Sequence, residues 1–158
     1  MRTLVAMLAT AAAVAASGCG ATARTTTVQT SAFPTLTSAT VTFNSKDHGK
    51  DEDSNLTVQL LRDNGELGAE IRTVGTKFDD HASSGPFSFS MTGPFTTGDV
   101  NDGELRLRLA ADGDDDWTFD MNMTLRFSDG TTRNFRWQNV RLDHNQPERV
   151  LTLAGGRT

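Results

Sequence analysis

Acidic residues occur in several short stretches of the chain, and two of these stretches have a spacing suited to Ca²⁺. Both fit the pattern D-x-[DN]-x-[DN], with Asp51, Asp53 and Asn55 in one and Asp112, Asp114 and Asp116 in the other. Ca²⁺ takes about six to eight oxygen ligands from carboxylates, carbonyls and water, so such loops are a suitable source of ligands. Neither stretch is an EF-hand, because the sixth position holds Leu56 or Trp117 instead of glycine.

The acidic stretches also alternate with predicted strands, so we expect them to meet in space. Successive antiparallel strands reverse direction, and the loops after the first, third, fifth and seventh strands therefore share one end of the fold. Crowded like charges need a counter-charge, which a divalent cation supplies. The predicted Ca²⁺ ligands are Asp47, Asp51, Asp53, Asn55, Asp79, Asp80, Asp112, Asp114 and Asp116. The competing interpretation is a set of ordinary polar turns, because aspartate favours loops for local backbone reasons.

The three histidines suggest an alternative metal chemistry. Each directly follows an aspartate, and each falls on a loop assigned to the same end of the fold: His48, His81 and His144. Three imidazoles with nearby carboxylates are ligands for Zn²⁺ or Cu²⁺. The alternative prediction is therefore a transition-metal-binding or metalloenzyme-like domain. Against it stands the simpler interpretation of three surface histidines in polar loops.

The elements that must position these residues are β-strands. From Trp117 to Phe127 every odd position is large and apolar and every even position is polar, which predicts a strand with one buried face. Shorter alternating stretches surround Val41, Val58, Ile71, Phe87–Met91, Leu107, Phe135–Leu142 and Leu151. The chain therefore predicts an all-β fold, an antiparallel two-layer β-sandwich of about seven or eight strands. A closed barrel is the alternative.

Two predicted hairpins have a register that the apolar pattern can test. A two-residue turn at Asn64-Gly65 would pair Leu60 with Ala69 and Val58 with Ile71, which puts both apolar sets on one face. After the long strand, a three-residue loop over Ser128–Gly130 would pair Met123 with Phe135 and Met121 with Trp137. The apolar parity then changes, which predicts a bulge near Gln138-Asn139.

The N-terminus predicts export. Residues 1–18 have a basic start and an Ala-rich apolar run, as in a signal peptide. Ala16-Ser17-Gly18-Cys19 resembles the lipobox of bacterial lipoproteins, which implies cleavage before Cys19 and lipidation of Cys19. We expect a flexible Thr/Ala-rich tether over 19–35, the β-sandwich over 36–154 and a tail over 155–158. The protein would be anchored to a bacterial membrane in the cell envelope, the outer membrane if the cell is Gram-negative.

Composition limits the partners and the chemistry. The formal net charge is −5, and removal of Arg2 with the signal peptide leaves 14 basic against 20 acidic residues, which disfavours nucleic acid. The chain has no Gly-x-Ser-x-Gly, no catalytic thiol and no phosphate-binding glycine loop, so we do not expect an enzyme. Arginines at outward strand positions form either a solvated face or a face for an anionic sugar or a protein partner.

The acidic loops followed by a Trp at a strand start resemble the C2 and PLAT families of calcium-dependent β-sandwich modules. The likeness lies in Asp51, Asp53, Asp112, Asp114 and Asp116 and in the architecture of about residues 40–153. The resemblance implies a non-catalytic, calcium-dependent module that binds membrane, lipid or protein partners. For this chain we expect a carbohydrate or protein ligand. The expected function is a lipid-anchored binding or structural module with a Ca²⁺ site. A plain structural envelope lipoprotein without a specific ion is a further alternative.

Overall fold

Strand β7 (Asp116–Phe127) is the longest alternating stretch of the sequence and lies inside one of two sheets. The computed structural model describes residues 33–111, 113 and 115–158. All six apolar residues of β7 are at most 2% exposed, while the intervening residues face outward. The period-two pattern therefore identified the buried face correctly, because alternate residues of a strand point to opposite sides of a sheet.

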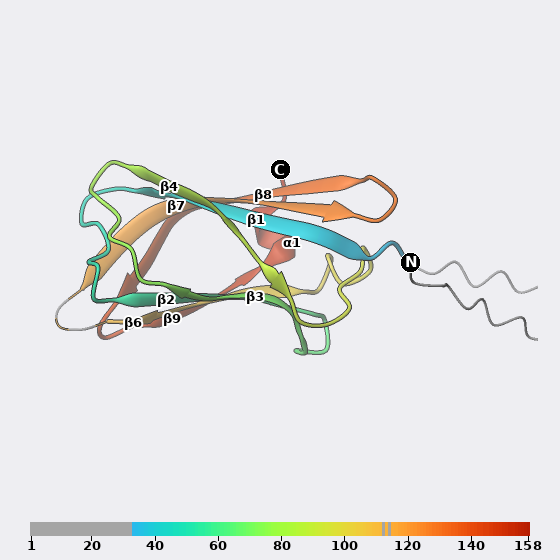
Figure 1. Ribbon diagram of the computed structural model, residues 1–158, viewed down its shortest axis with the longest axis horizontal. Coiled ribbons are helices and arrows are strands. Elements are labelled where there is room, and N and C mark those ends of the chain that lie inside the picture. The colour runs from blue at the N-terminus through green and yellow to red at the C-terminus, as the bar shows by residue number, and fades with distance from the viewer. Residues whose placement is uncertain (1–32, 112, 114) are drawn as a thin grey trace, which may run out of the picture. The chain divides into compact units, whose positions relative to one another are not determined.

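The structure is an all-β sandwich of two antiparallel sheets (Figure 1). The first sheet has the order β4 (Ser83–Ser88), β1 (Leu36–Ser45), β7 and β8 (Thr132–Asp143). The second has the order β5 (Ser90–Met91), β3 (Leu67–Val74), β2 (Asn55–Leu61), β6 (Glu104–Ala110) and β9 (Glu148–Thr152). A short helix, α1 (Leu153–Gly156), ends the chain. The apolar faces of both sheets form one core between them.

The β2–β3 hairpin has the predicted register but a different turn. Leu60 pairs with Ala69 and Val58 pairs with Ile71, as expected. The turn itself is a three-residue loop, because the Arg62 amide donates to the Glu66 carbonyl and Gly65 has a φ of 81°. An irregularity in the pairing next to the turn restores the register. The prediction of a two-residue turn is therefore wrong, since a bulge supplies the compensating residue.

The β7–β8 hairpin is confirmed in both its loop and its register. Gly130 donates to the carbonyl of Phe127 and has a φ of 82°, as a three-residue loop with a left-handed glycine requires. Met123 pairs with Phe135 and Met121 with Trp137. The predicted bulge is also present, because the register shifts beyond Trp137 and Asn139 adopts a φ of 55°.

The predicted strand around Phe87–Met91 is divided between the two sheets, so the described residues form nine strands instead of seven or eight. Strand β4 pairs with β1, and β5 pairs with β3. Phe89 lies at the crossing and is buried, whereas Met91 is 41% exposed. Alternation with Phe87 and Phe89 predicts that Met91 faces the core. This prediction is wrong, because the chain leaves one sheet and joins the other within these residues.

The last residues pack against β8 instead of extending as a tail. Gly156 is buried next to the ring of Trp137, and Arg157 forms a β-bridge with Phe135. At the other end of the chain, the predicted signal peptide, Cys19 and most of the tether lie outside the described residues. No helix within the described part of the chain is long and apolar enough to cross a membrane.

Candidate functional site

Four loops meet at one end of the sandwich, on the left in Figure 1. They follow β1, β3, β6 and β8, and their described residues are 46–54, 75–82, 111, 113, 115 and 144–147. We call this end the acidic pole. Backbone contacts join the loops: Lys50 forms a bridge with Phe78, and the His144 amide donates to the Asp115 carbonyl at 3.1 Å. The expectation that alternate loops share an end is confirmed.

An aromatic cluster forms the base of the acidic pole. The ring of Trp117 lies 5.3 Å from that of Phe43 and 5.2 Å from that of Phe78, between centroids. The Trp117 indole also donates to the Ser45 hydroxyl at 3.0 Å, which satisfies its only polar atom. Because these residues come from β1, β7 and the loop after β3, their packing fixes three of the four loops to the core.

Lys50 lies at the centre of the acidic pole and is fully buried. Its ammonium donates to the carbonyls of Asp51 at 2.6 Å and Ser54 at 2.5 Å. It also lies 5.5 Å from the centroid of the Phe78 ring, a cation–π distance. Burial lowers the pKa of Lys50, and the nearby carboxylates of Asp115, Asp51 and Asp53 oppose this effect. The sequence pattern does not indicate this internal cation.

Gly49 allows Lys50 to reach this position. A Cβ on Gly49 would lie 1.9 Å from the carbonyl oxygen of Phe78, so no larger residue fits without displacing a loop. The Gly49 amide donates to the Asp80 carboxylate at 2.5 Å. The glycine thus holds the β1–β2 loop directly against the β3–β4 loop. A glycine next to a lysine within an acidic loop was the only sequence signal for this arrangement.

Asp115 and Asp51 form a pair of carboxyl groups above Lys50. Asp115 is 7% exposed, and its Oδ2 atom is buried without a hydrogen-bond partner. The charge of Asp115 raises the pKa of Asp51, and partial desolvation and a shared side-chain hydrogen bond act in the same direction. Asp51 therefore binds a proton more readily than an isolated aspartate does, because two adjacent carboxylates repel each other.

The acidic residues of the pole divide into paired and unpaired groups. The pairs are Asp47 with His81 at 3.4 Å, Asp79 with Lys77 at 3.1 Å, and Asp116 and Asp143 with Arg141 at 2.8 and 3.3 Å. Asp51, Asp80 and Asp115 form no ion pair among the described residues. These three line a single cavity of about 280 Å³, together with His48 and Asp116.

The structure thus brings together only some of the residues that the sequence singled out. Asp51, Asp80, Asp116 and His48 line this cavity, and Asp79 lines a second one together with Asp51 and Asp80. Asp47, Asp53 and Asn55 line neither. Asp112 and Asp114 lie outside the described residues. Of the other histidines, His81 contacts Asp47 and His144 contacts the Asn145 amide at 2.8 Å. Within the described ranges, no group of three or more His, Cys, Asp or Glu side chains is arranged to hold a metal.

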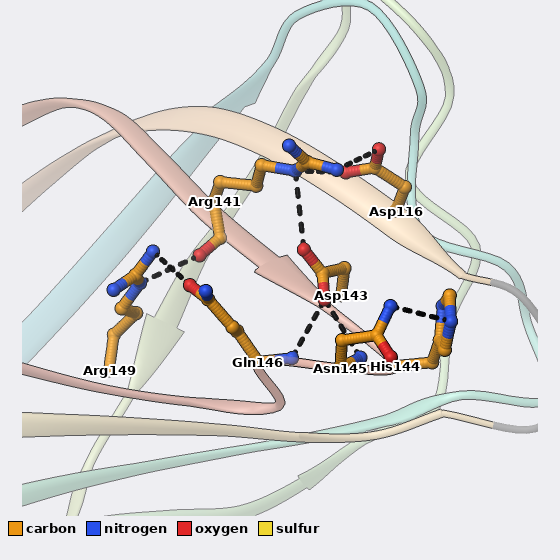
Figure 2. Close-up of polar contacts among 7 residues, drawn as sticks. All are labelled: Asp116, Arg141, Asp143, His144, Asn145, Gln146 and Arg149. Carbon is orange, nitrogen blue, oxygen red and sulfur yellow. Dashed lines mark hydrogen bonds and ion pairs between the residues drawn. The ribbon is translucent and has the colours of Figure 1, made fainter.

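Arg141 connects the start of β7 to the end of β8 beside the acidic pole (Figure 2). Its guanidinium donates to both carboxylate oxygens of Asp116 at 2.8 Å. Asp143 accepts from the backbone amides of Gln146 and Asn145 at 2.7 and 2.8 Å. The Gln146 amide lowers the pKa of Asp143; burial opposes this shift, while the Asn145 amide and the charge of Arg141 reinforce it. Because Arg141 binds both of its oxygens, the Asp116 carboxylate already has a structural partner.

Comparison with models of known protein families and with curated proteins gave no match to this chain. Its function is therefore inferred from its residues and from the geometry of the acidic pole.

Proposed function

We propose that this chain is an exported, lipid-anchored binding module without catalytic activity, and that Ca²⁺ binds at its acidic pole. The lipobox-like tetrad ending at Cys19 supports the anchor, which would place the sandwich in the cell envelope of a bacterium. The resemblance to C2 and PLAT modules supports a role in which the ion orders loops for a ligand. Lipid on Cys19 would provide the membrane contact, at about 0.8 kcal/mol per buried methylene.

The observation that carries the calcium proposal is the shared cavity of Asp51, Asp80 and Asp115. These carboxylates lack ion-pair partners among the described residues, and one Asp115 oxygen is buried without a hydrogen-bond partner. Burying a carboxylate oxygen without a partner is costly, so an additional ligand there would stabilise the fold. Lys50 acts on Asp115 and Asp51, and the exposed Lys77 acts on Asp51 and Asp80, so two cations face three carboxylates.

The donor atoms suit a hard cation. Carboxylates of Asp51, Asp80 and Asp115 would supply oxygen ligands, with water completing the shell, and oxygen donors favour Ca²⁺ over Zn²⁺ or Cu²⁺. The side chains do not form a compact three-ligand group as they stand. We therefore expect a weak site, with a dissociation constant of about 10⁻⁴ to 10⁻³ M as in extracellular calcium modules. The ion would neutralise the pole and order its loops.

Thermal unfolding of the purified, chelator-treated protein tests this proposal. At 10 mM Ca²⁺ the free energy of unfolding should rise by about 1.4 to 2.7 kcal/mol, and Mg²⁺ should not reproduce the effect. Asp115→Asn should abolish the increase. Asp63→Asn, in an exposed turn outside the acidic pole, is the matched control and should retain it. The Ca²⁺ effect should shrink at low pH, because protons compete with the ion for Asp51, whose pKa is raised by the neighbouring Asp115 carboxylate.

Three results would contradict the proposal. An unchanged free energy of unfolding in Ca²⁺ would favour the alternative of ordinary polar turns in a plain structural lipoprotein. An equal response in the Asp115→Asn variant would place the ion elsewhere. A response to Zn²⁺ alone would favour the transition-metal alternative with His48, His81 and His144.

A further inference from the structure

A second candidate binding site lies between the edge strands of the two sheets. Strand β8 ends the first sheet and β9 ends the second, and a cleft of about 590 Å³ is lined by residues from both. This volume lies within the range of about 300 to 1,000 Å³ that is usual for ligand sites. The polar lining residues are Arg136, Gln138, Asn139, Arg141 and Arg149.

The charge of this cleft is opposite to that of the protein as a whole. Three arginines line it, and no Asp or Glu of the described chain does. The full sequence has 20 acidic against 15 basic residues, so an arginine-only lining is unexpected. A local positive potential in an acidic protein selects for an anionic ligand, because it attracts negative groups that the rest of the surface repels.

Arg149 is held in place without being neutralised. Its guanidinium donates to the backbone carbonyl of Arg141 at 3.1 Å and to the side-chain oxygen of Gln146 at 2.6 Å (Figure 2). Both acceptors are uncharged, and Arg149 forms no ion pair in the described part of the structure. An arginine fixed by neutral acceptors keeps its charge and its remaining donors for another group.

The other two arginines have different roles. Arg141 is paired with Asp116 and Asp143 and serves mainly to support the cleft. Arg136 has one carboxylate neighbour, Asp120, at 3.7 Å, and Asp120 is already shared with Lys46 at 3.1 Å. Arg149 and Arg136 therefore remain the two cations of the cleft that an anionic ligand can engage.

The edge of β8 disfavours a peptide strand as the occupant. The bulge at Gln138-Asn139 interrupts the regular pattern of amides and carbonyls that an added strand would need. The Arg149 side chain already donates a hydrogen bond to the Arg141 carbonyl, and Arg157 forms a β-bridge with Phe135. A sugar chain needs no such ladder. Its hydroxyls can bond to the amide of Gln138, and its charged groups to the arginines.

We propose that this cleft binds an acidic polysaccharide, with the carboxylate or sulfate groups of the sugar paired to Arg149 and Arg136. The inference is independent of the calcium site, because no residue lines both the arginine cleft and the cavity of the acidic pole. Cleft and acidic pole contact each other through the side chains of Arg141 with Asp116, Arg149 with Gln146 and Lys46 with Asn139.

Titration of the purified protein with two acidic probes tests the proposal: oligogalacturonate, which carries carboxylates, and heparin-derived oligosaccharides, which carry sulfates. Fully methyl-esterified oligogalacturonate, which has the same sugar chain without the charge, is the ligand control. At least one acidic probe should bind, and the neutral ester should not. Arg149→Gln and Arg136→Gln should each weaken binding about tenfold or more, as loss of a charge-assisted contact does.

Arg126→Gln is the matched control variant, because Arg126 is exposed on β7 outside the cleft and forms no ion pair within the described residues. It should leave affinity unchanged, and unfolding midpoints should show that each variant folds. Absence of binding to both acidic probes would overturn the proposal. An equal loss of affinity in the Arg126→Gln variant would show that the probes bind by nonspecific charge attraction and not at the cleft. If poly-glutamate bound at the same arginines with equal affinity, the ligand would be an acidic peptide and not an acidic polysaccharide.

Discussion

Replacement of Lys50 by methionine gives the sharpest test of how the acidic pole is held together. Methionine keeps most of the apolar stem that packs near Phe78 and removes the ammonium. The carbonyls of Asp51 and Ser54 lose this donor, and the buried Asp115 carboxylate loses its nearby positive charge. The variant therefore separates the effect of the charge from the effect of the packing.

The expected magnitude follows from two opposing contributions. Hydrogen bonds from a charged donor contribute about 1.5 to 3 kcal/mol each, and Lys50 makes two to carbonyls. Removal of a buried ammonium relieves a desolvation cost of several kcal/mol. The loss of the two hydrogen bonds exceeds this relief, because Asp115 and Asp51 also lose the nearby positive charge of Lys50. We therefore expect Lys50→Met to lower the free energy of unfolding by about 3 kcal/mol.

Urea unfolding followed by tryptophan fluorescence measures this change. The chain has two tryptophans, Trp117 and Trp137, and Trp117 packs against Phe78 directly below Lys50. Lys77→Met is the control, because the Lys77 side chain is 59% exposed; its effect should stay within about 0.5 kcal/mol. Asp115→Asn in the Lys50→Met background should recover about 1 to 2 kcal/mol, the coupling expected of neighbouring charges.

A neutral or stabilising Lys50→Met substitution would refute this account of the pole. So would strictly additive effects of Lys50→Met and Asp115→Asn, since additivity means that the two charges do not interact.

Two further substitutions test the framework around the site. Gly49→Ala should destabilise the fold by about 2 kcal/mol or more, since its Cβ would lie 1.9 Å from the Phe78 carbonyl, whereas Gly98→Ala meets only ordinary contacts; equal urea midpoints for the two would contradict this. Asp99→Asn should cost about 1 to 3 kcal/mol at pH 7. Burial acts to raise the pKa of Asp99, but hydrogen bonds from Thr96 and Arg62 outweigh it and lower that pKa below 3.8. Its contribution is therefore present above pH 3.8 and lost as pH falls further, so a difference between wild type and variant that stays constant down to pH 2 would be inconsistent with this cause.

The sandwich and most of its register follow from the sequence because alternation reports burial directly. In β7 every apolar residue belongs to the core, so the pattern and the environment coincide. The same parity selected the three-residue loop before Thr131 and located the bulge after Trp137. The two-residue turn at Asn64-Gly65 was wrong because a local turn signal says nothing about a compensating bulge a few residues later. The exposure of Met91 could not be read either, since alternation does not reveal where a chain changes sheets.

The candidate site was only partly predictable because it depends on contacts between distant loops. The convergence of acidic loops follows from strand direction alone. Burial of Lys50 does not, because its neighbours in sequence are charged and polar, and only the approach of Phe78 from another loop removes it from water. The Asp51–Asp115 pair likewise joins two loops from different strands. The arginine cleft combines the edges of both sheets, so neither strand alone indicated it.

The position of β1 has a mechanical consequence. The chain enters the sandwich at Leu36, which pairs with Phe127 at the end opposite the acidic pole, and β1 runs toward that pole between β4 and β7. A pull on the N-terminal side would therefore act along the strand and load the hydrogen bonds of two ladders in shear, all at once. Peeling from a sheet edge would break them one after another. A domain attached through this end resists extension under tension and presents its loops to the side away from the load.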